Sequence, residues 1–444
     1  MKRTLGVLVF VLAFVSLAAL AQDQPAPTGT NPTKTTYLSL SNNANAILVE
    51  PVTLDPVRSR ILVIVIHPDR INNFNYFIGV TLPQYGYRTM MVNYYGQELN
   101  YYEFLRPIAA AVKAARAVPG VEKVLIAGHS TGGAEVSSYQ VVAENGPSVC
   151  QVPERIVKCD PKGIESLPKV DGLMLIDANS GAPEKTIGIN PAVDGHNPHI
   201  RHPELDMFSP ANGYDPKKPV NYSPEFLNRF FAAQAAKANQ MIDDALARLV
   251  KIQKGEGDYK DDEPYIVSGS AIRINGARPE LADLNLLSKT HAPHMVLKAD
   301  GSRPTEIVHQ VYGNISEPET EDTLAGTTLH LTVKQFLSVQ ALRVTKDYRE
   351  NEDSLQGIIW NTTANSIQGN ITGIHVPTLV LSATCAAHME LLETAYDLSP
   401  AKDKTFVGLE GANHGLQPCR PEFGDTYKRG FDYIDEWISK PGRF

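Results

Sequence analysis

The ten residues VLIAGHSTGG, residues 124–133, are the most informative stretch of this 444-residue sequence. Four apolar residues, typical of a buried strand, lead directly into Gly128–Gly132, and a helical stretch follows over residues 133–144. A serine between two glycines at a strand-to-helix turn matches the G-x-S-x-G pattern of a nucleophile elbow. Because such a sharp turn holds the central hydroxyl in the open, we predict that Ser130 is a nucleophile.

Buried strands alternate with helices on both sides of this turn. Helices are predicted over residues 101–118, 133–144, 390–398 and 423–438, and a short hairpin over residues 37–50. Continuous apolar runs predict strands at residues 60–66, 87–93, 123–127, 170–176, 378–382 and 405–409. Strands that alternate with helices in this way predict a mostly parallel central sheet flanked by helices.

The alternation breaks over residues 181–373. A long helix begins after Ser223, a good N-cap residue followed by proline, and runs to about Lys254. A second helix is expected over residues 333–344. This stretch therefore predicts a large, mainly helical insertion that lies over the sheet.

The first 21 residues have the pattern of a signal peptide. Lys2 and Arg3 precede an apolar run over residues 5–20, and the stretch 19–21 reads Ala-Leu-Ala, a typical cleavage pattern. The alternative, a membrane anchor, is disfavoured because the run is short for a bilayer-spanning helix. We therefore expect a secreted or periplasmic protein with no integral membrane segment in the mature chain.

Composition narrows the classes of partner. Hydrophobic residues make up 43% of the chain and charged residues 20%, which is typical of a globular protein. The formal net charge is −8, and no basic run is present. Since nucleic-acid binding depends on neutralising phosphates with lysine and arginine, we expect no nucleic-acid partner.

Four cysteines, an even number in an exported chain, indicate disulfide bonds. Three pairings are possible, and Cys150–Cys159 is favoured as a short local loop. No cysteine or histidine spacing matches a zinc site, so no metal and no cofactor are expected.

A serine nucleophile needs a base. His414, within the sequence Gly411–Gly415, follows the last predicted strand by five residues and precedes the final helix. A loop at that sheet edge can place the imidazole over the elbow. His67 and His129 lie nearer the elbow in sequence but are expected to be wall or packing residues.

Across residues 37–182 and 374–444 the chain resembles the α/β-hydrolase superfamily, with Ser130 before His414 in the order that superfamily requires. The resemblance implies an α/β-hydrolase fold with a cap inserted after the sixth strand. It also implies a Ser–acid–His triad and an acyl-enzyme mechanism. The predicted domains are the signal peptide, the first part of the core, the cap, and the second part of the core with His414, over residues 1–21, 22–182, 183–373 and 374–444.

The acid of the triad is where this sequence departs from the family. The usual position, a few residues after the seventh strand, holds Ala386 or Ala387. Asp177 ends the sixth strand, where a minority of the superfamily carries its acid, and is preferred. Glu390, slightly late in the seventh-strand loop, is the alternative acid, and a chain without a triad acid is also open.

The resemblance also implies an oxyanion hole and a second disulfide. One donor is the backbone N–H of Thr131, directly after the nucleophile. The other comes from the loop after residues 60–66, where Pro68 lacks an N–H and Asp69 is therefore favoured. The loops that carry Cys385 and Cys419 are neighbours in this fold, which implies a disulfide between them.

These features predict a secreted serine hydrolase that cleaves a carboxylic ester, with a small-molecule or lipid-like substrate. Three phenylalanines on the long helix, Phe226, Phe230 and Phe231, are compatible with a sizeable organic group, although such residues are more typical of the core of a cap. An amidase or peptidase on the same triad is an alternative. A non-catalytic binding protein built on a hydrolase fold is another, and the sequence identifies neither the acyl group nor the alcohol.

Overall fold

The computed structural model describes residues 31–67, 73–94, 100–270, 277–283, 287–311, 328–386 and 389–444, apart from the side chain of Leu281. The predicted signal peptide and the predicted oxyanion donor Asp69 lie outside these ranges. Within them, no helix combines the length and the apolar character needed to cross a membrane.

A ten-stranded sheet forms the centre of the molecule, in the order β1-β2-β4-β3-β5-β6-β13-β14-β8-β9. The seven strands from β4 to β8 are parallel, and antiparallel partners are added at both edges. The strands are β1 (Thr33–Leu40), β2 (Ala44–Pro51), β3 (Ile61–Ile66), β4 (Arg88–Tyr94), β5 (Lys123–Ser130), β6 (Gly172–Ala178), β8 (Lys289–Leu297), β9 (Thr305–His309), β13 (Thr378–Ala383) and β14 (Lys404–Leu409). The mostly parallel sheet expected from the sequence is thereby confirmed.

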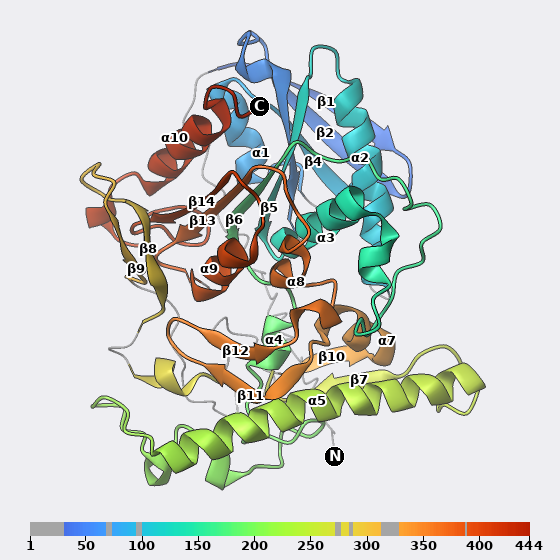
Figure 1. Ribbon diagram of the computed structural model, residues 1–444, viewed down its shortest axis with the longest axis vertical. Helices are drawn as coiled ribbons and strands as arrows, with labels where there is room; N and C mark the ends of the chain where they lie inside the picture. Colours follow the sequence, from blue (N-terminus) through green and yellow to red (C-terminus); the bar gives the residue numbers. More distant parts are fainter. Residues whose placement is uncertain are drawn as a thin grey trace, which may run out of the picture.

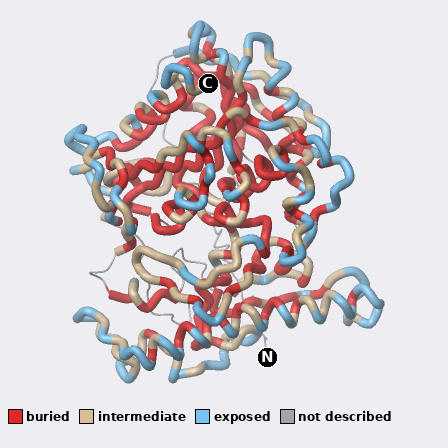
Figure 2. The backbone as a smooth tube through the Cα atoms, viewed as in Figure 1, coloured by how far each residue is buried: buried red, intermediate tan, exposed pale blue. Residues whose placement is uncertain are grey.

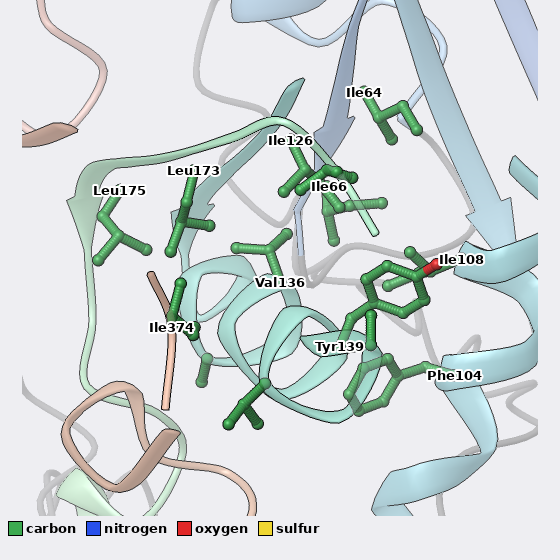
Figure 3. Packing of buried hydrophobic residues seen from close by; sticks show 14 of the residues in the cluster. Ile64, Ile66, Phe104, Ile108, Ile126, Val136, Tyr139, Leu173, Leu175 and Ile374 are labelled. Atoms are coloured by element: carbon green, nitrogen blue, oxygen red, sulfur yellow. The ribbon is translucent and has the colours of Figure 1, made fainter. Parts of the chain in front are cut away.

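Helices cover both faces of the sheet (Figure 1). One face carries α1 (Phe77–Thr81) and α10 (Thr426–Ser439), and the other carries α2 (Leu105–Ala117), α3 (Gly132–Asn145), α8 (Ile367–Ile371) and α9 (Met389–Leu398). Strand β3 shows why two layers are needed, because its alternate residues join opposite cores and all six are buried. Figure 3 shows Val136 of α3 among residues of β3, β5 and β6, and Tyr139 of the same helix beside Phe104 and Ile108.

A separate hydrophobic core lies under the long helix α5 (Pro224–Lys254). The helix begins where the Ser223 side chain accepts the N–H of Phe226 at 3.1 Å, and it ends at Gly255, whose φ of 73° is left-handed. Phe226, Phe230 and Phe231 are buried in this core. They therefore stabilise the layer that contains α5. Two small sheets, β7 (Pro264–Val267) with β10 (Leu329–Thr332) and β11 (Val344–Glu350) with β12 (Leu355–Ile358), complete it.

Buried backbone is concentrated in the central sheet and again where α5 meets these small sheets (Figure 2). The region expected to be cap, residues 183–373, contributes to both layers. Strands β8 and β9 extend the central sheet beyond β14, and α8 packs on α3. The sequence predicts that residues 183–373 form only a cap. In the structure, part of this region instead belongs to the layer of the central sheet. Only Met295–Leu297 of β8 pair with β14, and the strand contains a proline, so no apolar run indicates it.

The second helix expected in the insertion is also shorter than residues 333–344. Its helical turns, α7 (Val333–Gln335) and a π-helical turn (Phe336–Gln340), end before β11 begins at Val344. The capping box formed by Thr332 and Gln335 explains why the sequence indicates a helix start there.

Candidate active site

Ser130 lies at the junction of β5 and α3 in the left-handed backbone region, with a φ of 54°. A residue other than glycine adopts this conformation only when its surroundings impose it. The flanking glycines make the turn tight, because a Cβ atom at Gly132 would lie 2.5 Å from the carbonyl oxygen of Ile66, and one at Gly128 would lie 2.6 Å from the carbonyl oxygen of Gly132. The strand–turn–helix context predicted for the elbow is confirmed.

Thr131 directly precedes Gly132, the first residue of α3. The first N–H groups of a helix have no acceptor within the helix, and the helix dipole is positive at that end. The backbone next to Ser130 is thus suited to stabilise a negative charge.

Asp177 lies at the same edge of the sheet as Ser130. In the register between β5 and β6, Ser130 is opposite Ala178, after an irregularity that follows His129. Asp177 also has a positive φ of 39°, which for aspartate indicates a constrained position. Since the carboxyl ends of parallel strands face one edge, both residues lie where α/β sheets bind their ligands.

The side chain of Asp177 joins two further segments. One carboxylate oxygen accepts the Nδ1–H of His414 at 2.6 Å, and the other accepts the backbone N–H of Ala383, at the end of β13, at 2.9 Å. Asp177 is only 2% exposed, so its charge-assisted hydrogen bonds are shielded from water. With Nδ1 donating to the carboxylate, Nε2 of His414 keeps its lone pair and can accept a proton.

The loop that carries His414 is held rigidly. The Asn413 side-chain oxygen accepts the backbone N–H groups of Gly415 and Gln417, at 2.9 and 3.0 Å. A disulfide links Cys385 to Cys419 within this region, with Cα atoms 6.3 Å apart. The imidazole is therefore presented by a braced turn.

The other disulfide joins Cys150 and Cys159, with Cα atoms 5.6 Å apart. Both expected cysteine pairs are thus at bonding distance. Within the segment that this disulfide closes, the N–H of Ile156 donates to the carbonyl oxygen of Thr362 at 2.9 Å.

Glu390, the alternative acid, has other partners. It is buried at the start of α9, where one carboxylate oxygen lies 2.8 Å from Nη1 of Arg278 and the other accepts the hydroxyl of Ser288. Arg278 also lies 2.9 Å from Glu350. The imidazole of His414 thus contacts Asp177, while Glu390 belongs to an ion-pair cluster with Arg278 and Glu350.

Other buried carboxylates interact electrostatically with this cluster. Burial raises the pKa of Glu184 to about 8, and the charges of Glu390 and Glu350 contribute to that rise. Burial also raises the pKa of Glu280 to about 7. No motif in the sequence indicates the cluster, because its members come from distant segments.

His129 lies against His414, and His67 lies next to His129. The ring centroids of His129 and His414 are 4.3 Å apart, and those of His129 and His67 are 5.7 Å apart. Burial and the charge of His414 lower the pKa of His129 well below its usual range and that of His67 to about 4. His414 therefore has a neutral imidazole, that of His129, packed against its ring.

The described residues contain one group that could hold a metal ion, His129, Asp177 and His414, whose ligand atoms lie within 4.8 Å of one another. Its atoms already serve the hydrogen bonds given above, and His129 contacts the hydroxyl of Tyr76 as well as a backbone carbonyl. A metal ion would have to displace these bonds.

The sheet order, the elbow after β5 and the histidine loop after β14 together define an α/β-hydrolase fold. The sequence matches no family model and no curated protein.

Several solved structures resemble the chain at low sequence identity. A hypothetical protein from Pseudomonas aeruginosa is 11% identical, with 94% of this chain and 96% of that one covered and a TM-score of 0.43. Carboxyl esterase 2 from Tuber melanosporum is 11% identical, with coverages of 95% and 90% and a TM-score of 0.39. The esterase domain from a Rhodothermus marinus protein is 13% identical, with coverages of 92% and 98% and a TM-score of 0.36.

Proposed function

We propose that this protein is a serine hydrolase that cleaves carboxylic esters through Ser130, His414 and Asp177. The observation that carries the proposal is the 2.6 Å contact between Nδ1 of His414 and the buried carboxylate of Asp177, at the sheet edge where the β5–α3 turn presents Ser130. A hydroxyl in a strained turn, an imidazole and a buried carboxylate are the parts that nucleophilic acyl transfer requires.

In the proposed reaction, Ser130 Oγ attacks the acyl carbon while Nε2 of His414 takes the hydroxyl proton. The carbonyl electron pair moves onto oxygen, where the backbone N–H groups of Thr131 and Asp69 stabilise the charge. Collapse of this intermediate breaks the ester C–O bond, and His414 gives its proton to the departing alcohol. Water then attacks the acyl-enzyme with His414 as base, which releases the acid and restores Ser130. Asp177 holds the imidazole tautomer and stabilises the imidazolium, and the cycle needs no cofactor.

We also propose that the protein is exported from the cytoplasm. The signal-peptide pattern of residues 1–21 and the two disulfides support a secreted or periplasmic location, where disulfides persist. N-terminal sequencing of the protein recovered outside the cytoplasm should begin near Gln22, whereas a chain that retains residues 1–21 there would contradict the cleavage.

A chain-length panel of chromogenic esters, with matched anilides, tests the reaction class. We expect the esters to be hydrolysed and the Ser130→Ala variant to lose activity on every ester. Faster turnover of the anilides would instead identify an amidase. The absence of turnover and of fluorophosphonate labelling would favour a binding protein.

A further inference from the structure

His129, the variable residue of the G-x-S-x-G motif, contacts the loop of His414 in two ways. Its Nε2 lies 2.7 Å from the backbone carbonyl oxygen of His414, and its ring packs against the His414 ring at 4.3 Å. The two residues are 285 positions apart in sequence. The nucleophile turn and the base are therefore joined directly by one side chain.

The hydrogen bonds of His129 determine where its proton lies. A carbonyl oxygen can only accept, so Nε2 must carry the hydrogen. The other ring nitrogen, Nδ1, contacts the hydroxyl of Tyr76, the residue that precedes α1. Burial, the largest cause, lowers the pKa of His129 and keeps the ring neutral, so Nδ1 accepts the hydroxyl hydrogen of Tyr76.

The surroundings of His129 favour the neutral ring with its hydrogen on Nε2. The ring is 2% exposed and makes an edge-to-face contact with Phe77 at 5.2 Å. A neutral ring also suits the reaction, because a second positive charge beside His414 would make that imidazole a weaker base.

We propose that Tyr76 and His129 are positioning residues for His414: the chain from the Tyr76 hydroxyl through His129 to the His414 carbonyl fixes the base over Ser130. The inference rests on the proposed function, since it assigns His414 as the base. Hydrogen bonds in series strengthen one another, so Tyr76 makes the Nε2–H of His129 a better donor. A base displaced by about 1 Å can cost a factor of about 100 in rate.

Two substitutions of His129 separate hydrogen bonding from packing. His129→Phe keeps a ring against His414 but removes the donor, and we expect kcat to fall about 10- to 100-fold with little change in KM. In His129→Gln the side-chain N–H lies as many bonds from Cα as Nε2 does, so this variant should recover most of the lost kcat.

Tyr76→Phe should lower kcat by a smaller factor, since it weakens the chain without breaking it. Tyr427→Phe is its matched control, because Tyr427 is also buried and its hydroxyl contacts Thr81 rather than His129. Wild-type kcat is expected for the control. Equal losses in His129→Phe and His129→Gln, or in Tyr76→Phe and Tyr427→Phe, would overturn the inference.

A nitrogen NMR spectrum of the histidine-labelled protein gives a readout that does not depend on activity. The His129 ring, assigned by its absence in His129→Phe, should show a protonated Nε2 and an unprotonated Nδ1. A protonated Nδ1 would refute the inference. If Ser130→Ala retains activity, the proposed function is wrong. If Ser130→Ala is inactive but His129→Phe has the kcat of the wild type, only the positioning role of His129 is wrong.

Discussion

Exchanging each candidate acid for its amide separates a catalytic carboxylate from a structural one. In Asp177→Asn the amide oxygen accepts the N–H of Ala383, as one carboxylate oxygen does now, and the amide NH2 then faces Nδ1 of His414. An N–H pointing at Nδ1 selects the tautomer that carries its hydrogen on Nε2. That tautomer cannot accept the proton of Ser130.

The corresponding change in a serine triad lowers kcat by about 10⁴-fold. At 1.36 kcal/mol per factor of ten, this loss is about 5.4 kcal/mol of transition-state stabilisation. The fold should survive, because the shape of the side chain and its bond to Ala383 are retained.

Glu390→Gln is the matched control, since this carboxylate is also buried near the same sheet edge but pairs with Arg278. Its expected loss is in stability, by up to about 3 kcal/mol, because the buried Arg278 loses one of its carboxylate partners. Its kcat/KM at a temperature where it is folded should stay near wild type.

The assay is kcat/KM on the best chromogenic ester together with a thermal melt for both variants. We predict a large rate loss with a nearly unchanged melting temperature for Asp177→Asn, and the reverse for Glu390→Gln. If Asp177→Asn stays within tenfold of wild type while Glu390→Gln loses 10³-fold, our assignment of the acid is wrong.

Two further predictions concern stability. Removal of the Cys385–Cys419 disulfide, which spans 34 residues, should cost about 3.8 kcal/mol in the chain-entropy estimate, against about 2.6 kcal/mol for Cys150–Cys159, which spans 9 residues. Paired Cys→Ser variants compared in denaturant melts and ester assays should show that the first also lowers kcat; equal kcat in both would argue against bracing of the His414 loop. Because burial raises the folded-state pKa of Glu184 from its ordinary 4.5 to about 8, its contribution to stability is fully present below about pH 4.5 and is lost as the pH rises to about 8. Melting temperatures from pH 4.5 to 8.5 should therefore decline less steeply in Glu184→Gln than in wild type, and parallel pH profiles would contradict this.

The sequence predicts Ser130 and His414 because each lies in a local pattern at the end of a buried strand. Asp177 could be proposed for the same reason, since it ends the strand next to the elbow in the fold. Its two hydrogen-bond partners, however, are more than 200 residues away, so sequence alone left Glu390 as an alternative.

Features that depend on long-range packing were not predictable. The partners Arg278 and Glu390 are 112 residues apart, and no spacing rule connects them. The sequence does not indicate strand β8, because few of its residues enter the sheet core. His129 lies inside the recognised motif, yet its link to His414 follows only from how the two loops meet in space.

Covalent labelling tests the central assignment most directly. The protein is incubated with a fluorophosphonate, digested, and mapped by mass spectrometry while residual esterase activity is followed. We expect a single adduct on Ser130 that forms in step with the loss of activity, and no adduct in Ser130→Ala. An adduct on another residue, or ester hydrolysis that survives in Ser130→Ala, would contradict it.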